Sequence, residues 1–306
     1  MSLSRMDLDA KGAGSPEGLV ARILKAEPGL SAPIPIEQLC RALDITDIQD
    51  LDSEGFEGGL ITDTERSAGI ILARKGYPYR CRFTIAHELA HFLIPTHMPD
   101  IPGRFLCSRA DMARLSASES DRRGRMEVQA NRFASLLLIP PPLLRSRLVD
   151  LKDPNISQMV QLAEDFEVSK QAMARAYAQY HQELIAFVFI KAGKVLFTYK
   201  HSKFPFIVVR QGTPIPERSL FRRKPVRRGD ASEIAECIPD VWIDVERGRP
   251  APGLFEQVLG QRDDYAILML WLERAEEEEE SDEEAEMTSK ERLRSRIGRY
   301  GAQRTY

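Results

Sequence analysis

Residues 83–93 read FTIAHELAHFL, an apolar run that contains the pattern His-Glu-x-x-His. The run has no Gly or Pro before Pro95, so we expect it to form a helix. On a helix, His87 and His91 lie one turn apart on one face, and both imidazoles can reach one metal ion at about 2 Å. Glu88 lies about a quarter turn away from His87, where a carboxylate can take a proton from a water molecule at the metal.

A chance origin of this pattern is a poor explanation. The chain has 5 His in 306 residues, so the pattern should arise by chance in roughly 1% or fewer of such chains. Burying two imidazoles and a carboxylate in an apolar helix without partners would also be costly. We therefore interpret residues 83–93 as a metal-binding helix.

The composition is that of an ordinary globular protein, with 43% hydrophobic and 29% charged residues. The net charge of −3 provides no overall basic field that would attract nucleic acid or anionic lipid. Residues 1–14 lack the apolar core of a signal peptide, and no apolar run is long enough to span a membrane. We expect a soluble cytoplasmic protein without a membrane partner. Disulfides and cysteine-type zinc sites are not indicated, because no CxxC pair occurs among the cysteines Cys40, Cys81, Cys107 and Cys237.

The chain divides by its patterns into five segments, and the fold class that we expect is α+β. Residues 1–15 read as a flexible lead, and residues 16–148 as the domain that holds the metal helix. Short strands near 56–61 and 68–73 should form a hairpin before that helix. The remaining segments are a helical module at 149–182, a β-rich domain at 183–273 and a disordered tail at 274–306, acidic and then basic.

A catalytic zinc needs a third protein ligand, and two residues compete for that role. His97 follows His91 by six residues, as in the pattern HExxHxxGxxH, but that pattern needs Gly where Ile94 stands. A β-branched residue before Pro95 is unsuited to a positive φ. The rival is Glu127, at the expected start of a second apolar helix over 127–139 that Pro140 ends. We favour Glu127, which would complete a His₂Glu ligand set.

The motifs RFTIAHELAH at 82–91 and Glu127-x-x-Ala130-Asn131 resemble the ImmA/IrrE family of metallopeptidases. Both occur in the family's order, and the resemblance covers roughly residues 16–145. It implies a zincin-like domain with one Zn²⁺ per chain, held by His87, His91 and Glu127, and with Glu88 as the general base. One departure is Ile139, where Met is usual, a mild change at a core position.

Two further residues are candidates for roles near the metal. Asn131 lies one turn after Glu127 on the same helix face, so it can hydrogen-bond to a metal ligand from behind. Cys107 lies in a loop-rich stretch, residues 95–120, between the two ligand helices. A thiolate there could reach the open metal position and hold the enzyme inactive until it is oxidised or displaced. A packed or solvated cysteine is the alternative, since no nearby charge favours the thiolate.

The second half of the chain carries weaker signals. Residues 155–177 resemble a helix-turn-helix, but residues 152–180 hold three basic and four acidic side chains, a net charge of −1 that suits phosphate contact poorly. Direct DNA binding is therefore not expected. Strands are expected at 184–190, 195–199, 242–245 and 265–272. Residues 212–216 resemble a segment of three-domain IrrE-like members, which implies a GAF-like domain.

These observations lead to one main functional hypothesis and one alternative. The main hypothesis is a zinc-dependent endopeptidase, and the resemblance implies that it cleaves a helix-turn-helix repressor of stress-response or mobile-element genes. A substrate segment could add to the free edge of the strand at 68–73. The alternative is a transcription regulator or ligand-sensing module with a structural or vestigial zinc site. The intact Glu88 argues against the alternative, because a structural site needs no general base.

Overall fold

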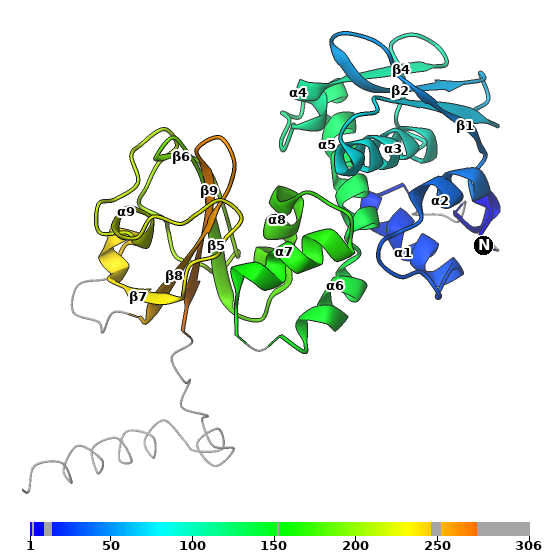
Figure 1. Cartoon of the computed structure of the whole chain (residues 1–306). Helices are drawn as coiled ribbons and strands as arrows, with labels where there is room; N and C mark the ends of the chain where they lie inside the picture. The colour runs from blue at the N-terminus through cyan, green and yellow to red at the C-terminus, as the bar shows by residue number, and fades with distance from the viewer. Residues whose placement is uncertain (2, 9–13, 152, 246–251, 274–306) are drawn as a thin grey trace, which may run out of the picture.

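The computed structural model describes residues 1, 3–8, 14–151, 153–245 and 252–273. It is a mixed α+β structure with two sheets, as expected, and helices α6 to α8 lie between the two sheet-containing parts (Figure 1). The predicted acidic and basic tail at 274–306 lies outside the described residues. No helix of the described part is long and apolar enough to cross a membrane.

The first sheet has the strand order β1-β3-β2-β4. The expected hairpin is present as β2 and β3, and two strands that the sequence did not predict flank it. Because β3 lies between β1 and β2, the expectation that residues 68–73 form a free edge was wrong. The edge strands are β1 and β4, and β4 falls inside the stretch expected to be loop. The strands are β1 (Ile45–Asp50), β2 (Phe56–Thr62), β3 (Gly69–Ala73) and β4 (Arg104–Ser108).

Two long helices pack against each other beside this sheet, α3 (Pro78–Leu93) and α5 (Arg122–Leu138). Pro78 occupies the first turn of α3, where its missing N–H costs nothing. The helix ends at Leu93 because Ile94 is extended before Pro95. Helix α5 begins five residues earlier than expected, since the Asp121 side chain caps it by accepting from the Gly124 amide at 2.8 Å. Glu127 therefore lies in its second turn.

Smaller elements complete the first domain. Helix α4 (Arg109–Met112) follows β4 directly, and helices α1 (Pro16–Ala26) and α2 (Ile36–Ala42) precede the sheet. Within the predicted lead, η1 (Arg5–Leu8) is a short 3-10 helix, and the side chain of Leu8 is buried. That part of the lead packs onto the folded domain.

Three helices follow the first domain and lead to the second sheet. Asn155 and Ser169 cap α7 and α8 with their side chains, which fixes both helix starts. Glu167 has a φ of 51° in the tight turn between them. The identification of this pair as a helix-turn-helix stays a prediction. The helices are α6 (Pro141–Leu148), α7 (Ile156–Asp165) and α8 (Lys170–Tyr180).

The second sheet is antiparallel with the order β6-β5-β9-β8-β7. The expected strand at 242–245 was wrong: a 3-10 turn, η2 (Pro239–Val241), precedes it, and Ile243 forms only an isolated bridge with Ile207. Trp242 is instead anchored in the core by a hydrogen bond to Glu256. The elements are β5 (Leu184–Lys191), β6 (Lys194–Lys200), α9 (Leu220–Arg223), β7 (Ala235–Cys237), β8 (Leu254–Gly260) and β9 (Tyr265–Leu272).

The buried apolar residues form two clusters. The first is continuous from α1, α3 and α5 through α7 and α8 to one face of the second sheet, where Phe187, Phe189 and Met269 belong to it. The second cluster covers the opposite face of that sheet around Trp242. The helices α7 and α8 therefore share one core with α3 and α5 and with the second sheet.

Candidate metal centre

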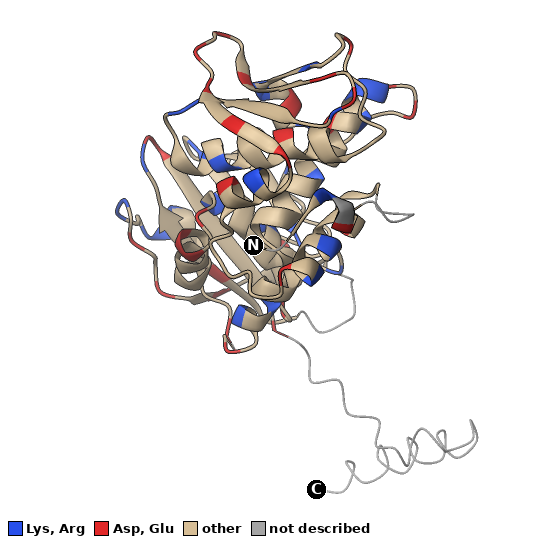
Figure 2. Cartoon of the chain, turned by 90° about the vertical axis from the view of Figure 1, so that its right-hand side faces the viewer, with Lys and Arg blue, Asp and Glu red and all other residues tan. Residues whose placement is uncertain are grey.

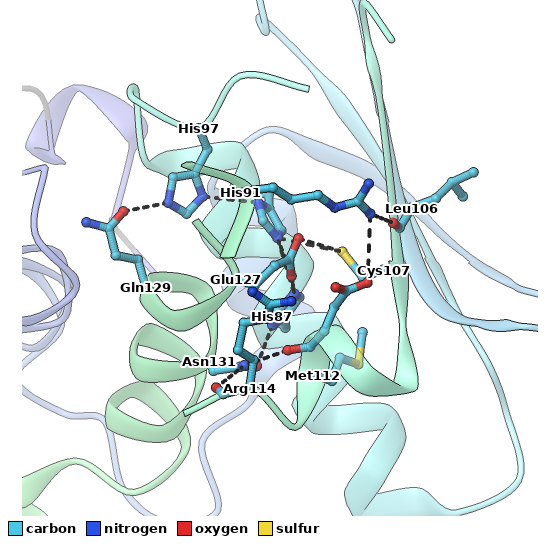
Figure 3. A network of polar contacts seen from close by, with 12 residues as sticks. His87, His91, His97, Leu106, Cys107, Met112, Arg114, Glu127, Gln129 and Asn131 are labelled. Carbon is cyan, nitrogen blue, oxygen red and sulfur yellow. Dashed lines mark hydrogen bonds and ion pairs between the residues drawn. The ribbon is translucent and has the colours of Figure 1, made fainter. Parts of the chain in front are cut away.

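Helices α3 and α5 bring three potential ligand atoms together inside the first domain (Figure 3). The Nε2 atoms of His87 and His91 lie 3.2 Å apart. The Glu127 Oε2 atom lies 3.1 Å from His87 Nε2 and 3.6 Å from His91 Nε2. Both imidazoles are 0% exposed and Glu127 is 3% exposed. The structure thus juxtaposes the three side chains that the sequence proposed as ligands.

The hydrogen bonds around Asn131 fix the tautomer of His87. The Asn131 side-chain amide donates to the backbone carbonyls of Asp111 at 2.9 Å and Arg114 at 3.0 Å. Its Oδ1 atom is therefore an acceptor, and His87 Nδ1 donates to it at 2.9 Å. His87 consequently presents a bare Nε2 lone pair to the centre. Asn131 lies behind a ligand candidate, where the sequence placed it.

His97 and Gln129 fix the tautomer of His91 in the same way. The sequence analysis missed this role of His97. Figure 3 shows His97 between His91 and Gln129. His97 Nε2 donates to Gln129 Oε1 at 2.9 Å, so His97 Nδ1 accepts the proton of His91 Nδ1 at 3.0 Å. The bare Nε2 of His91 then faces Glu127. The spacing of six residues after His91 was noticed, but it was weighed only as a ligand spacing.

The ionisation of these groups agrees with a site built for a cation. Burial lowers the pKa of His91 to about 4 and that of His97 to about 3, so both rings are neutral at pH 7. Burial alone would raise the pKa of Glu127, but its close approach to His87 and His91 outweighs burial and holds that pKa well below its ordinary value. For His87, burial opposes protonation, yet Glu127 and Glu88 raise its pKa. Positive charge is thus favoured at this position.

The donor set also fits zinc by its dimensions. In a tetrahedral site with Zn–N and Zn–O distances of about 2.0 Å, neighbouring ligand atoms are about 3.3 Å apart. The separations here, 3.1, 3.2 and 3.6 Å, lie around that value. Two nitrogen lone pairs and a carboxylate oxygen that face one another repel unless a positive charge lies among them; in the metal-free protein a proton on His87 supplies that charge, and a metal ion at the centre would replace it.

Glu88 lies on α3 beside these atoms and is 0% exposed. Neither carboxylate oxygen has a hydrogen-bond partner among the described residues. Burial raises its pKa to about 7. Gly58 on β2 leaves room for it: a Cβ there would lie 2.7 Å from Glu88 Oε1 and 2.5 Å from the Thr84 methyl group. An unpartnered buried carboxylate near pKa 7 is suited to accept and release a proton.

Cys107 is part of the same cluster. It lies on β4, where alternation turns Phe105 and Cys107 inward and leaves Leu106 partly exposed. Its Sγ atom is 3.6 Å from His91 Nε2 and 4.0 Å from Glu127 Oε1. One ligand atom from each of four side chains lies within 4.8 Å of all the others; the four are His87, His91, Cys107 and Glu127. The sequence analysis named Cys107 but placed it in a loop.

Comparisons with known proteins agree with this geometry. Residues 45–177 match the family model Peptidase_M78, described as the IrrE N-terminal-like domain. A solved structure described as a Mycobacterium tuberculosis transcriptional regulator superposes with a TM-score of 0.53 at 16% identity, covering 84% of this chain and 75% of that chain. At that identity the likeness concerns the fold alone. No curated protein matches the chain.

Proposed function

Residues 45–177 form an IrrE N-terminal-like domain, and from this premise we propose that the chain is a zinc-dependent metalloendopeptidase. His87, His91 and Glu127 would hold one Zn²⁺, and Glu88 would be the general base. The observation that carries the proposal is the convergence of two bare imidazole nitrogens and a carboxylate oxygen, all buried, next to the unpartnered Glu88 carboxylate.

Zinc, when bound, supplies an electrophile that polarises the scissile carbonyl and makes a nearby water molecule more acidic. The chain's own groups then divide the remaining work. Glu88 accepts the water proton and returns it to the leaving amine, for which a pKa near 7 is well matched. Asn131 and His97 keep both imidazoles oriented with Nε2 toward the centre.

The substrate that we propose is a DNA-binding repressor of the helix-turn-helix type, whose cleavage would release stress-response or mobile-element genes. This rests on the resemblance to the ImmA/IrrE family. The outer edge of β4, which pairs with β2 alone among the described strands, would offer backbone groups to an extended substrate segment, although the Leu106 carbonyl already accepts a hydrogen bond from Arg123 at 3.1 Å. This edge takes the role that the sequence analysis gave to the strand at 68–73.

We propose that the helix pair α7–α8 and the β-rich, GAF-like domain serve to position that substrate rather than to read DNA. The first turn of α8 faces the second sheet: Gln171 donates to the Tyr199 hydroxyl at 3.0 Å, and the Arg175 guanidinium lies 5.8 Å from the Tyr199 ring centroid. The side chains of Gln171 and Arg175 are thereby engaged within the protein, whereas a DNA-binding helix would need such side chains to contact DNA. On the face that Figure 2 displays, basic and acidic residues are interspersed rather than gathered into a basic surface.

One further function deserves a test, because the structural neighbour is described as a transcriptional regulator. In that alternative, this chain binds DNA or a small ligand and its metal site is structural or vestigial. Glu88 favours the peptidase, since a purely structural site gains nothing from an unpartnered buried carboxylate and bears the cost of burying it.

The deciding experiment incubates the zinc-loaded chain with purified helix-turn-helix repressors from the same genome, beginning with any that is encoded beside its gene. Glu88→Gln should keep its zinc and lose cleavage by on the order of 10²–10⁴, from the loss of general-base catalysis. Glu54→Gln, at an exposed site on the β1–β2 loop, is the matched control and should cleave like the parent. Unchanged cleavage by Glu88→Gln would show that the assigned base is wrong. Operator binding without any cleavage by the parent would favour the regulator.

A further inference from the structure

The mechanism proposed for the peptidase assigns no role to Cys107, although its thiol lies among the ligand atoms. It is 1% exposed, and its Sγ atom approaches His91 Nε2 to 3.6 Å. A second feature points to a cation there: both carboxylate oxygens of the fully buried Glu88 lack a hydrogen-bond partner within bonding distance among the described residues, and, against the burial that raises the pKa of Glu88, the Cys107 thiol lies near enough to lower it. The inference below rests on the proposed zinc site and concerns how that site is regulated.

The distances suit a metal that is bound by sulfur as well as by nitrogen. With Zn–S at about 2.3 Å and Zn–N at about 2.0 Å, a tetrahedral site separates sulfur from nitrogen by about 3.5 Å. Cys107 Sγ and His91 Nε2 are 3.6 Å apart. The nitrogen pair of His87 and His91, at 3.2 Å, matches the corresponding value of about 3.3 Å. Cys107 Sγ lies 4.0 Å from Glu127 Oε1, and one ligand atom of each of the four side chains lies within 4.8 Å of the others, so a small shift of Cys107 toward the other ligands would place four protein ligands around one ion.

The site is also closed to a peptide. His87, Glu88 and His91 are each 0% exposed, and Glu127 is 3% exposed. Strand β4 and helix α4 contribute to this cover: Cys107 is inside the ligand group, and Thr84 contacts the Met112 sulfur at 3.5 Å. A scissile bond can reach Glu88 only after this cover moves, and the moving segment carries Cys107 with it.

We propose that Cys107 is the fourth zinc ligand of the resting protein, so that His87, His91, Glu127 and Cys107 form a closed, inactive centre. Withdrawal of β4 would exchange the thiolate for water and open the substrate path in a single movement. The thiol loses its proton to solvent when it binds the metal and regains one when it leaves, so the exchange needs no oxidant. The short edge strand is suited to this movement, since only β2 holds it among the described strands.

Cys107 can act as a thiolate ligand only when the metal ion is present. In the metal-free protein, burial and the nearby Glu88 and Glu127 raise the pKa of the thiol well above its ordinary value. A bound Zn²⁺ reverses that balance, because a coordinating thiol is deprotonated by the ion itself.

Zinc K-edge X-ray absorption on the zinc-loaded full-length chain tests the proposal without a substrate. The parent should show one sulfur at about 2.3 Å together with nitrogen and oxygen at about 2.0 Å. Cys107→Ser should keep one zinc and lose the sulfur. Cys81→Ser, on the first turns of α3 and outside the ligand group, should keep the sulfur.

The outcomes separate this inference from the proposed function. A parent protein that binds one zinc with nitrogen and oxygen only would overturn the Cys107 assignment and leave the peptidase intact. A parent that binds no zinc would overturn both. Because the parent's own spectrum decides the point, the result stands even where Cys107→Ser does not fold.

Discussion

At alkaline pH, the metal-free Glu88→Gln variant should have a higher free energy of unfolding than the metal-free parent. In acid this gain in stability should be small. Burial raises the pKa of Glu88 from 4.5 to about 7 in the folded chain. The folded state therefore holds this proton more tightly than the unfolded state, and stability is lost as the pH rises from 4.5 through 7. Above pH 8 the full loss is about 3 kcal/mol, since a pKa difference of one corresponds to about 1.4 kcal/mol.

Gln carries no such proton, so the comparison reports the titration of Glu88 together with its charge interaction with His87. The difference in unfolding free energy between Glu88→Gln and the parent should grow by about 2.5 kcal/mol in favour of the variant between pH 5 and pH 8. Urea unfolding of chelator-stripped protein, followed by far-ultraviolet circular dichroism, measures it. Glu54→Gln at its exposed site should follow the parent at every pH. A difference for Glu88→Gln that is independent of pH would refute the assigned burial and pKa.

Three other substitutions test the construction of the site. Gly58→Ala should lower the unfolding free energy by about 1–3 kcal/mol through overpacking against the Glu88 carboxylate, whereas Gly29→Ala, with nothing within 4 Å of the new Cβ, should leave it unchanged. Equal urea midpoints would contradict the crowding. Glu127→Ala should lose zinc in metal analysis, because a ligand is removed. His97→Ala should still bind it, but 10–100-fold more weakly in chelator competition, because only the support of His91 is lost; the reverse order would make His97 the ligand.

The sequence was sufficient to predict that His87, His91 and Glu127 lie together, because local rules decide most of that arrangement. A helix places His87 and His91 one turn apart whatever the rest of the fold is. The conflict at Ile94 correctly predicted that the chain would not turn sharply after the helix, and the structure shows Ile94 extended with a φ of −82°. Glu127 and Asn131 followed from a second helix whose period was clear, although its start was placed five residues too late.

What the sequence could not supply depends on pairing between distant segments. The order of β3 and β4 in the sheet decides which of them is an edge, and no local pattern encodes it. Strand β4 is only five residues long and follows Pro102 and Gly103, so turn signals hid its alternation. The role of His97 depends on Gln129, which lies on another helix 32 residues away.

The shared core also has a consequence for how the protein is made. The first backbone amide of α7, at Ile156, donates at 2.7 Å to Gln257 Oε1, a side chain 101 residues further along the chain. At a synthesis rate of roughly 5–20 residues per second, the ribosome would supply that acceptor on the order of 5–20 s after α7 itself. During this interval the face of α7 that later contacts β8 is uncovered, because β8 has not yet been translated. A nascent chain arrested before the second sheet is complete would therefore be a substrate for chaperones and quality-control proteases, even though every residue of its metal centre has already been translated.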